Sequence, residues 1–166
     1  MASGDTLCVF TAMDNEPPAA NFAQFDTANT TSPVPVLAFD TTTAWAAIFT
    51  SILPRNYAGG GITVYVHSAM ASAITGTLGW TVEFERFLAG TDNITAESWA
   101  SAQTITATTV PGTAGIAQVL NVAVSNGANM DSIAVGEGFR LRIKRDVSND
   151  TAAGNALLYA VELKET

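Results

Sequence analysis

The chain has 166 residues, of which 48% are apolar and 13% are charged, and its formal net charge at pH 7 is −8. This length fits one domain with a sizeable core, and the composition excludes a disordered chain. The negative charge argues against a broad surface for nucleic acid. Cys8 is the only cysteine, which excludes an intramolecular disulfide and a cysteine-rich metal site.

The first residues show neither the basic segment nor the apolar core of a signal peptide. No apolar run approaches the ~20 residues that a membrane-spanning helix needs. We therefore expect a soluble protein that is made in the cytoplasm and has no membrane partner.

The first predicted element is a strand over residues 5–12, which ends before a pair of prolines. Because it precedes the main run of strands, we divide the chain into an N-terminal arm, residues 1–19, and a domain, residues 20–166. An unpaired strand offers a row of backbone donors and acceptors to the sheet of a neighbouring chain. The candidate interface residues of this arm are Leu7, Val9 and Phe10.

A strand over residues 34–40 follows, and Pro35 places it at a sheet edge or at the start of a strand. Residues 41–53 are the best helix candidate. Threonines at its start can cap it, and apolar residues follow at i, i+3 and i+4 spacing. These apolar residues are Ala44, Trp45, Ile48, Phe49 and Ile52. The segment is uncharged, so we expect the helix to cover an open end of the domain.

Apolar and polar residues alternate strictly over residues 62–67 and 78–85, which predicts two strands with one face toward a core. Further strands are predicted over residues 102–110, 116–125, 139–144 and 156–164. Together these elements predict an all-β protein, a single antiparallel jelly-roll β-sandwich of about eight strands with one short helix. The predicted core residues are Leu37, Phe39, Ile62, Val64, Val66, Trp80, Val82, Phe84, Leu120, Val122, Phe139, Leu141, Ile143, Tyr159 and Val161.

Glu83 and Glu85 lie on one face of their strand. Paired carboxylates can hydrolyse glycosides, but Arg140 and Arg142 alternate in the same way on a strand expected to lie beside it. Opposite charges on neighbouring strands stabilise a sheet by about 0.2–1 kcal/mol per pair. We therefore predict structural ion pairs among these four residues and no catalytic residue, so the protein is expected not to be an enzyme.

Metal and cofactor sites have weak signals. His67 is the only histidine, too few for a histidine–carboxylate metal centre, and we expect it on the non-core face of its strand. The polar loop over residues 146–155 could bind calcium, but without EF-hand spacing a solvated turn is favoured. Its oxygen-bearing residues are Asp146, Asn149, Asp150 and Asn155. No nucleotide-binding loop or catalytic triad motif occurs, so no cofactor and no metal are predicted.

Several segments resemble, in their order, a type of small bacteriophage virion protein. They run from PVLAFD through LPRNYAGGGITVYVHSA and GTLGWTVEFERF to AVGEGFRLRIKRDVSNDTAAGNALLYAVEL, so the likeness covers roughly residues 34–163. The resemblance is to jelly-roll proteins that decorate or cement phage heads, and to related modules of tail fibres and spikes. It implies a trimer, contacts with a capsid, and no catalytic residues.

The main functional hypothesis is a capsid decoration or cement protein, a homotrimer that binds the major capsid protein from outside and stabilises the head of the virion. On this hypothesis Arg145 and its basic neighbours contact an acidic capsid surface. The alternative is a tail-fibre or spike module that binds a host-surface glycan. Its candidate aromatic residues are Tyr57, Trp99 and Trp45, of which Trp45 is expected to be packed.

Overall fold

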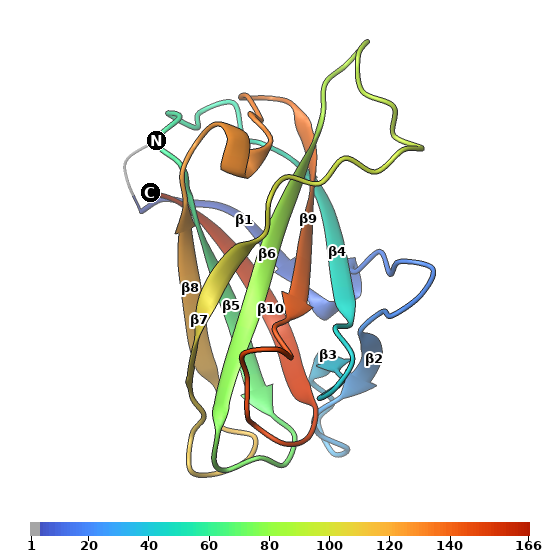
Figure 1. Ribbon diagram of the computed structural model, residues 1–166, viewed down its shortest axis with the longest axis vertical. Helices are drawn as coiled ribbons and strands as arrows, with labels where there is room; N and C mark the ends of the chain where they lie inside the picture. The colour runs from blue at the N-terminus through green and yellow to red at the C-terminus, as the bar shows by residue number, and fades with distance from the viewer. Residues whose placement is uncertain (1–3) are drawn as a thin grey trace.

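The computed structural model describes residues 4–166, which fold into two antiparallel β-sheets stacked face to face (Figure 1). The larger sheet contains β1 (Thr6–Thr11), β2 (Gln24–Thr27), β3 (Pro35–Phe39), β5 (Ile62–Met70), β8 (Gln118–Val124) and β10 (Ala156–Glu165). The smaller sheet contains β4 (Ala46–Ile52), β6 (Thr77–Phe87), β7 (Gln103–Thr109) and β9 (Gly138–Arg145). Within the described residues, helix is limited to two 3-10 turns, η1 (Ala12–Asp14) and η2 (Ala128–Met130).

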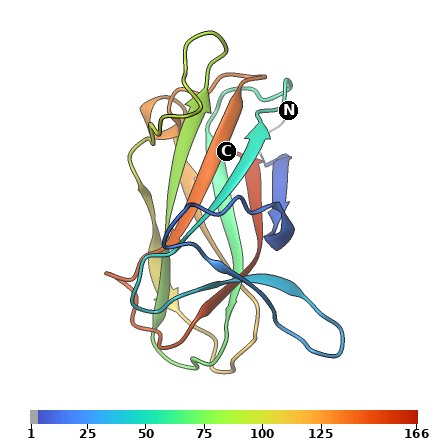
Figure 2. The same cartoon turned by 90° about the vertical axis from the view of Figure 1, so that its right-hand side faces the viewer.

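The strand order is that of a jelly roll. The larger sheet runs β2-β3-β10-β5-β8, with β1 also beside β10, and the smaller sheet runs β4-β9-β6-β7. From β3 onward, each connection except the one between β6 and β7 carries the chain from one sheet to the other. The predicted fold class is therefore confirmed. Figure 2 shows the two sheets from the side, with the β2–β3 hairpin projecting near the lower end.

The core lies between the sheets, where the inward side chains of the alternating strands meet. Trp80 of β6 is completely buried, and its ring stands edge-on to that of Phe39, with centroids 4.9 Å apart. The predicted core residues are buried except for two. Val122 is only partly buried, and Tyr159 lies on the outside of the larger sheet.

The helix predicted over residues 41–53 is wrong, because this segment contains strand β4, which pairs with β9 along its whole length. Phe49 of β4 faces the core, but Ala46 and Ile48 on the opposite face are buried as well. A strand buried on both faces contains apolar residues at nearly every position, so helical spacing appears by coincidence. Its β-branched and aromatic side chains also favour a strand.

The free edge of β4 is covered by the chain that precedes β2. Glu16 donates its backbone N–H to the carbonyl of Ile48 at 2.8 Å, and Ala23 donates to that of Ala46 at 2.9 Å. These bonds give partners to backbone carbonyls that would otherwise be unpaired at the edge of β4. Residues 15–23 are thus part of the sandwich rather than a linker.

The predicted N-terminal arm is also incorporated into the domain. β1 pairs with β10 of its own chain, from Thr6↔Lys164 to Thr11↔Ala160. Phe10 is buried and stacks on Phe49, with ring centroids 5.2 Å apart. β1 therefore belongs to the larger sheet of its own chain, so the expectation that residues 4–14 form an arm outside the domain is wrong. The addition of this segment to a neighbouring subunit stays a prediction. Residues 1–3 of the predicted arm lie outside the described residues. Among residues 4–166 there is no helix with the length and apolarity needed to cross a bilayer.

Candidate functional site

The outer face of the larger sheet presents polar and aromatic side chains from neighbouring strands. On β5, Tyr65 and His67 alternate with the core residues and point outward. Asn121 of β8 and Glu162 of β10 lie in register with Tyr65, one on each side. We call the surface formed by Tyr65, His67, Asn121, Tyr159, Glu162 and Lys164 the tyrosine face.

A β-bulge places Tyr159 on this face. The register between β10 and β5 shifts between Leu158 and Ala160, so Tyr159 is an extra residue opposite β5. Bulges of this kind redirect a side chain, and here the ring of Tyr159 lies 5.8 Å from that of His67 at an angle of 62°. The prediction that placed Tyr159 in the core is wrong because it assumed an unbroken alternation.

Charged groups surround the two tyrosines. The Lys164 ammonium lies 5.8 Å from the centroid of the Tyr65 ring. Glu162 accepts a hydrogen bond from the hydroxyl of Thr6 at 2.6 Å, and its other carboxylate oxygen lies 3.8 Å from Nε2 of His67. The side chains of His67 and Glu162 are 24% and 25% exposed, so both are positioned by neighbours and still accessible to a ligand.

The tyrosine face combines flat aromatic surfaces with hydrogen-bonding groups of both kinds. The phenol, amide and imidazole groups donate and accept, Lys164 donates, and Glu162 accepts. Because the face contains one ammonium, that of Lys164, and one carboxylate, that of Glu162, its net charge is small. Among the described residues, no group of three or more His, Cys, Asp or Glu could hold a metal ion. The arrangement is therefore suited to noncovalent binding of a ligand.

The residues predicted to form ion pairs meet on the outer face of the smaller sheet. Glu83 is in register with Arg142, and Glu85 with Arg140, across β6 and β9. Arg142 Nε lies 2.6 Å from Glu83 Oε2, and Lys144 Nζ lies 2.9 Å from the same oxygen. Arg140 Nε donates to Glu85 Oε2 at 2.6 Å. We call these five residues the charge ladder.

The charge ladder is covered by the loop over residues 88–102. The Trp99 ring centroid lies 4.2 Å from the guanidinium carbon of Arg142 and 4.9 Å from that of Arg140. The backbone N–H of Ser98 donates to the carboxylate of Glu85. Trp99 is therefore engaged with the ladder and does not offer an open face to a glycan.

Both glutamates of the ladder are buried: Glu83 is 7% exposed and Glu85 is 2% exposed. Burial disfavours the ionised form of Glu83, but the hydrogen bonds and charges of Arg142 and Lys144 outweigh it and lower its pKa. A general acid for glycoside hydrolysis needs the opposite shift, so Glu83 does not fit that role.

The other aromatic candidates for glycan binding are also engaged in the fold. Tyr57 is 6% exposed, and its hydroxyl accepts a hydrogen bond from the backbone N–H of Gly61 at 2.8 Å. Trp45 is partly buried against the core, as expected. One signal for the tyrosine face is visible in the sequence, namely the polar side of the alternation that contains Tyr65 and His67. Tyr159 had no such signal, because the bulge cannot be read from the alternation.

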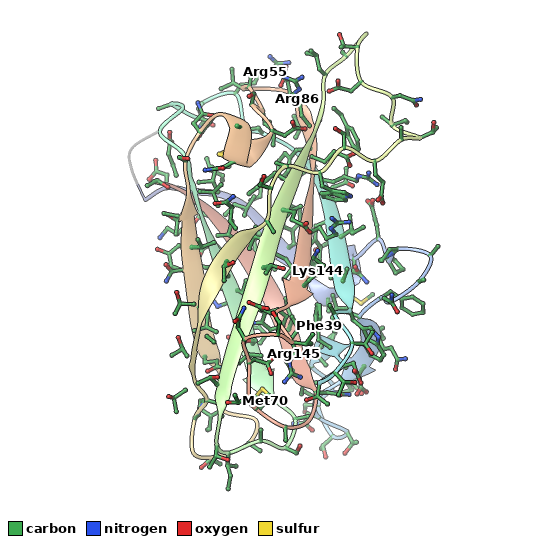
Figure 3. All side chains as sticks on the ribbon, viewed as in Figure 1. Phe39, Arg55, Met70, Arg86, Lys144 and Arg145 are labelled. Atoms are coloured by element: carbon green, nitrogen blue, oxygen red, sulfur yellow. The ribbon has the colours of Figure 1, made fainter. Side chains whose placement is uncertain are left out.

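Arg145, predicted to contact a capsid, is 1% exposed and lies inside the domain near Phe39 (Figure 3). Its guanidinium pairs with Asp150 and donates to the carbonyls of Ala152 and Gly154, each at 2.6 Å. A buried and fully engaged guanidinium cannot contact a partner, so its assignment to an interface is wrong. Of the other candidate interface residues, Phe10 is buried, Leu7 is partly buried and Val9 is exposed.

The loop considered for calcium uses its carboxylates internally. Asp150 pairs with Arg145, and Asp146 accepts hydrogen bonds from the side chains of Ser148 at 2.7 Å and Asn149 at 2.8 Å. Burial would raise the pKa of Asp146, but these hydrogen bonds outweigh it and lower the pKa. The carboxylates of Asp146 and Asp150 are thus largely buried and bonded within the domain, so the solvated turn expected from the sequence is wrong for these two residues.

No family model and no curated protein sequence matches the chain. Among solved structures, the chain is similar to the CBM22-1–GH10 modules of an endo-1,4-β-D-xylanase from Clostridium thermocellum. There the TM-score is 0.55 with 13% identity, covering 98% of this chain and 29% of that one. It is also similar to a family GH115 4-O-methyl-α-glucuronidase with specificity for decorated arabinogalactans, where the TM-score is 0.53 with 12% identity, covering 99% and 18%.

A carbohydrate-binding module from a Cellvibrio mixtus lichenase matches with a TM-score of 0.46 and 14% identity, over 98% of this chain and 99% of that one. The chain spans less than a third of the xylanase and glucuronidase structures. At these identities the two matches with TM-scores above 0.5 show a shared fold, the β-sandwich described above.

Proposed function

We propose that this protein is a noncatalytic module that binds a neutral glycan on the tyrosine face. The observation that carries the proposal is that Tyr65 and Tyr159 are both partly exposed on one sheet face, beside the partly exposed His67 and Glu162. The C–H groups of a sugar ring pack against aromatic faces, whose electron density is negative. Its hydroxyls hydrogen-bond to carboxylate, imidazole and amide groups, which fix the orientation of the ligand.

The charge of the face supports a neutral ligand. Lys164 and Glu162 offset each other, so neither an anionic nor a cationic ligand is favoured over a neutral one. A glycan-binding role was the alternative hypothesis from the sequence, and it is now preferred. The capsid-binding hypothesis came from the resemblance to virion proteins, and the residues that it assigned to capsid contacts, the N-terminal segment and Arg145, are integrated into the domain. The fold matches that we describe are to carbohydrate-active proteins and not to virion proteins.

The proposal is tested by native gel electrophoresis in the presence of a panel of soluble neutral polysaccharides. We expect at least one polysaccharide to retard the intact protein. Tyr65→Ala and Tyr159→Ala should each remove most of the retardation, and Tyr159→Phe should retain part of it because the ring is kept. Ile94→Ala, which changes an exposed apolar residue of the 88–102 loop, is the matched control and should behave like the intact protein.

Incubation of the protein with the bound polysaccharide should release no reducing sugar, as expected for a module without catalytic residues. The proposal fails if no neutral polysaccharide retards the protein, or if the tyrosine variants are retarded as strongly as the Ile94→Ala control.

A further inference from the structure

β2 is the outermost strand of the larger sheet and has a free edge. It pairs on one side with β3, from Gln24↔Ala38 to Thr27↔Pro35, and on its other side no strand pairs with it within residues 4–166. All four residues of β2 are exposed. An exposed edge presents unpaired backbone donors and acceptors to which another strand can add.

An apolar hollow of about 270 Å³ lies between residues 12–23 and the paired strands β2 and β3, to which it is joined at Phe25 and Leu37. Met13, Phe22 and Phe25 line it together with the buried Leu37. The first three are 69%, 42% and 56% exposed, which is unusual for large apolar side chains gathered in one place. The hollow therefore offers a place for apolar side chains that arrive with an added strand.

Three carboxylates, those of Asp14, Glu16 and Asp26, lie next in sequence to residues that line the hollow. None of the ion pairs formed within residues 4–166 includes any of them. Because three carboxylates lack a cationic partner here, an occupant with basic side chains would be electrostatically favoured.

From these observations we infer that the β2 edge binds an extended peptide segment in which apolar and basic residues alternate. The peptide backbone pairs with β2, the apolar side chains enter the hollow, and the basic side chains lie near Asp14, Glu16 and Asp26. Alternation is needed because successive side chains of a strand point to opposite faces. This site is separate from the tyrosine face and does not depend on glycan binding.

Two other occupants fit less well. A second copy of the chain would pair the two β2 edges around a twofold axis and bring Asp26 toward its own copy. A glycan would find few hydrogen-bonding partners, because Asn15 is the one lining residue with a side-chain amide or charge. A basic, partly apolar peptide matches both the charge and the lining.

The test is isothermal titration calorimetry of the intact protein with a capped peptide of about eight residues that alternates valine and lysine. We expect binding in about 0.05 M salt that weakens in about 0.5 M salt, because the carboxylates are exposed and their attraction is screened. A valine–glutamate peptide of the same length should not bind. N-methylation of every second residue, which removes backbone donors, should weaken binding at least tenfold.

Matched variants locate the site. Phe25→Ser should lower the affinity at least tenfold, whereas Ile94→Ser, at another exposed apolar position far from β2 in sequence, should leave it unchanged. Asp26→Asn keeps the acceptor for the N–H of Thr27 and should weaken binding at low salt, whereas Glu97→Gln should not. Thermal melting of each variant verifies that it is folded.

Equal affinity for the valine–glutamate peptide would overturn the inference, as would unchanged binding by Phe25→Ser or by the N-methylated peptide. Sedimentation of the protein without peptide measures its oligomeric state and so tests whether a second copy of the chain occupies the β2 edge. A dimer that Phe25→Ser dissociates would mean that another copy of the chain occupies the edge, and the peptide proposal would then be rejected.

Discussion

The indole ring of Trp99 lies over the guanidinium group of Arg142, with the ring centroid 4.2 Å from the guanidinium carbon. Through this contact, the loop over residues 88–102 covers part of the charge ladder, whose cations stay partly exposed. Glu83 and Glu85 are consequently almost completely buried, although they lie on the outer face of the sandwich.

Trp99→Ala should destabilise the fold by about 1–3 kcal/mol, because it removes two cation–aromatic contacts and exposes the ion pairs to water. Urea denaturation followed by far-ultraviolet circular dichroism measures the change in the free energy of unfolding. Ile94→Ala, in the same loop but 69% exposed, should change it by less than about 0.5 kcal/mol. Equal free energies of unfolding for the two variants would mean that the contacts of Trp99 with the ladder do not stabilise the fold.

Arg145 should be among the most sensitive polar positions. Its replacement by alanine leaves Asp150 and two buried carbonyls without their donor, which should cost about 3–5 kcal/mol. Arg145→Lys should recover only part of the loss, because one ammonium cannot reproduce the planar set of donors. Denaturant titration of both variants tests this, with exposed Arg55→Ala as the control. Full stability of Arg145→Lys would contradict the geometric argument.

Stability should fall in acid because of Asp40. Backbone N–H groups of Thr42 and Thr43, and the hydroxyl of Thr42, lower the pKa of Asp40 from its ordinary 3.8 to about 2. A carboxyl group whose pKa is lowered by folding stabilises the protein above its unfolded pKa. That contribution is lost as the pH falls through the folded value. The free energy of unfolding should therefore decrease between about pH 4 and pH 2.

Asp40→Asn should flatten this part of the pH dependence, because the amide keeps an acceptor but does not titrate. Glu97→Gln, at an exposed position, serves as the control and should retain the slope. The measurement is the free energy of unfolding from denaturant titrations at several pH values. An unchanged slope in Asp40→Asn would assign the acid sensitivity to other groups, such as Glu83.

Trp80→Ala should cost about 3–5 kcal/mol, since it removes a completely buried ring and leaves a cavity. The indole of Trp80 also stands edge-on to Phe39, so the variant loses a contact between the two sheets. Differential scanning calorimetry should show a large decrease in melting temperature. A melting temperature like that of the intact protein would contradict the assignment of Trp80 to the core.

The association state expected from the sequence, a homotrimer, stays a prediction. Its motivation is the low charged fraction of 13% and the resemblance to trimeric virion proteins. Sedimentation equilibrium should give three times the 17.2 kDa mass of one chain. A single-chain mass at high protein concentration would remove the prediction.

The sandwich could be predicted from sequence where one face of a strand is buried. β5, β6 and β9 alternate apolar and polar residues, so their core positions and the pairing of Glu83 with Arg142 followed directly. β4 could not be assigned this way, because both of its faces are buried and its edge is covered by residues 15–23. That cover is a tertiary contact with no local signal.

The tyrosine face could be predicted only in part. The alternation on β5 already placed His67 and Tyr65 outside the core. Tyr159 could not be found, because a one-residue bulge reverses its direction and no residue near it marks the bulge. Arg145 could not be assigned correctly either. The alternation of polar and apolar residues does not tell whether a cation is exposed or is buried against the following loop, as Arg145 is against Asp150.

The central position of β10 has a consequence for biosynthesis. β10 pairs with β5 along its length, with β3 at its beginning and with β1 toward its end, and of the strands within residues 4–166 it is the last to leave the ribosome. Until it emerges, β1 lacks its partner strand and β3 and β5 each retain an open edge. The nascent chain therefore carries several unpaired edges that can aggregate, and the larger sheet can close only after translation has passed residue 165.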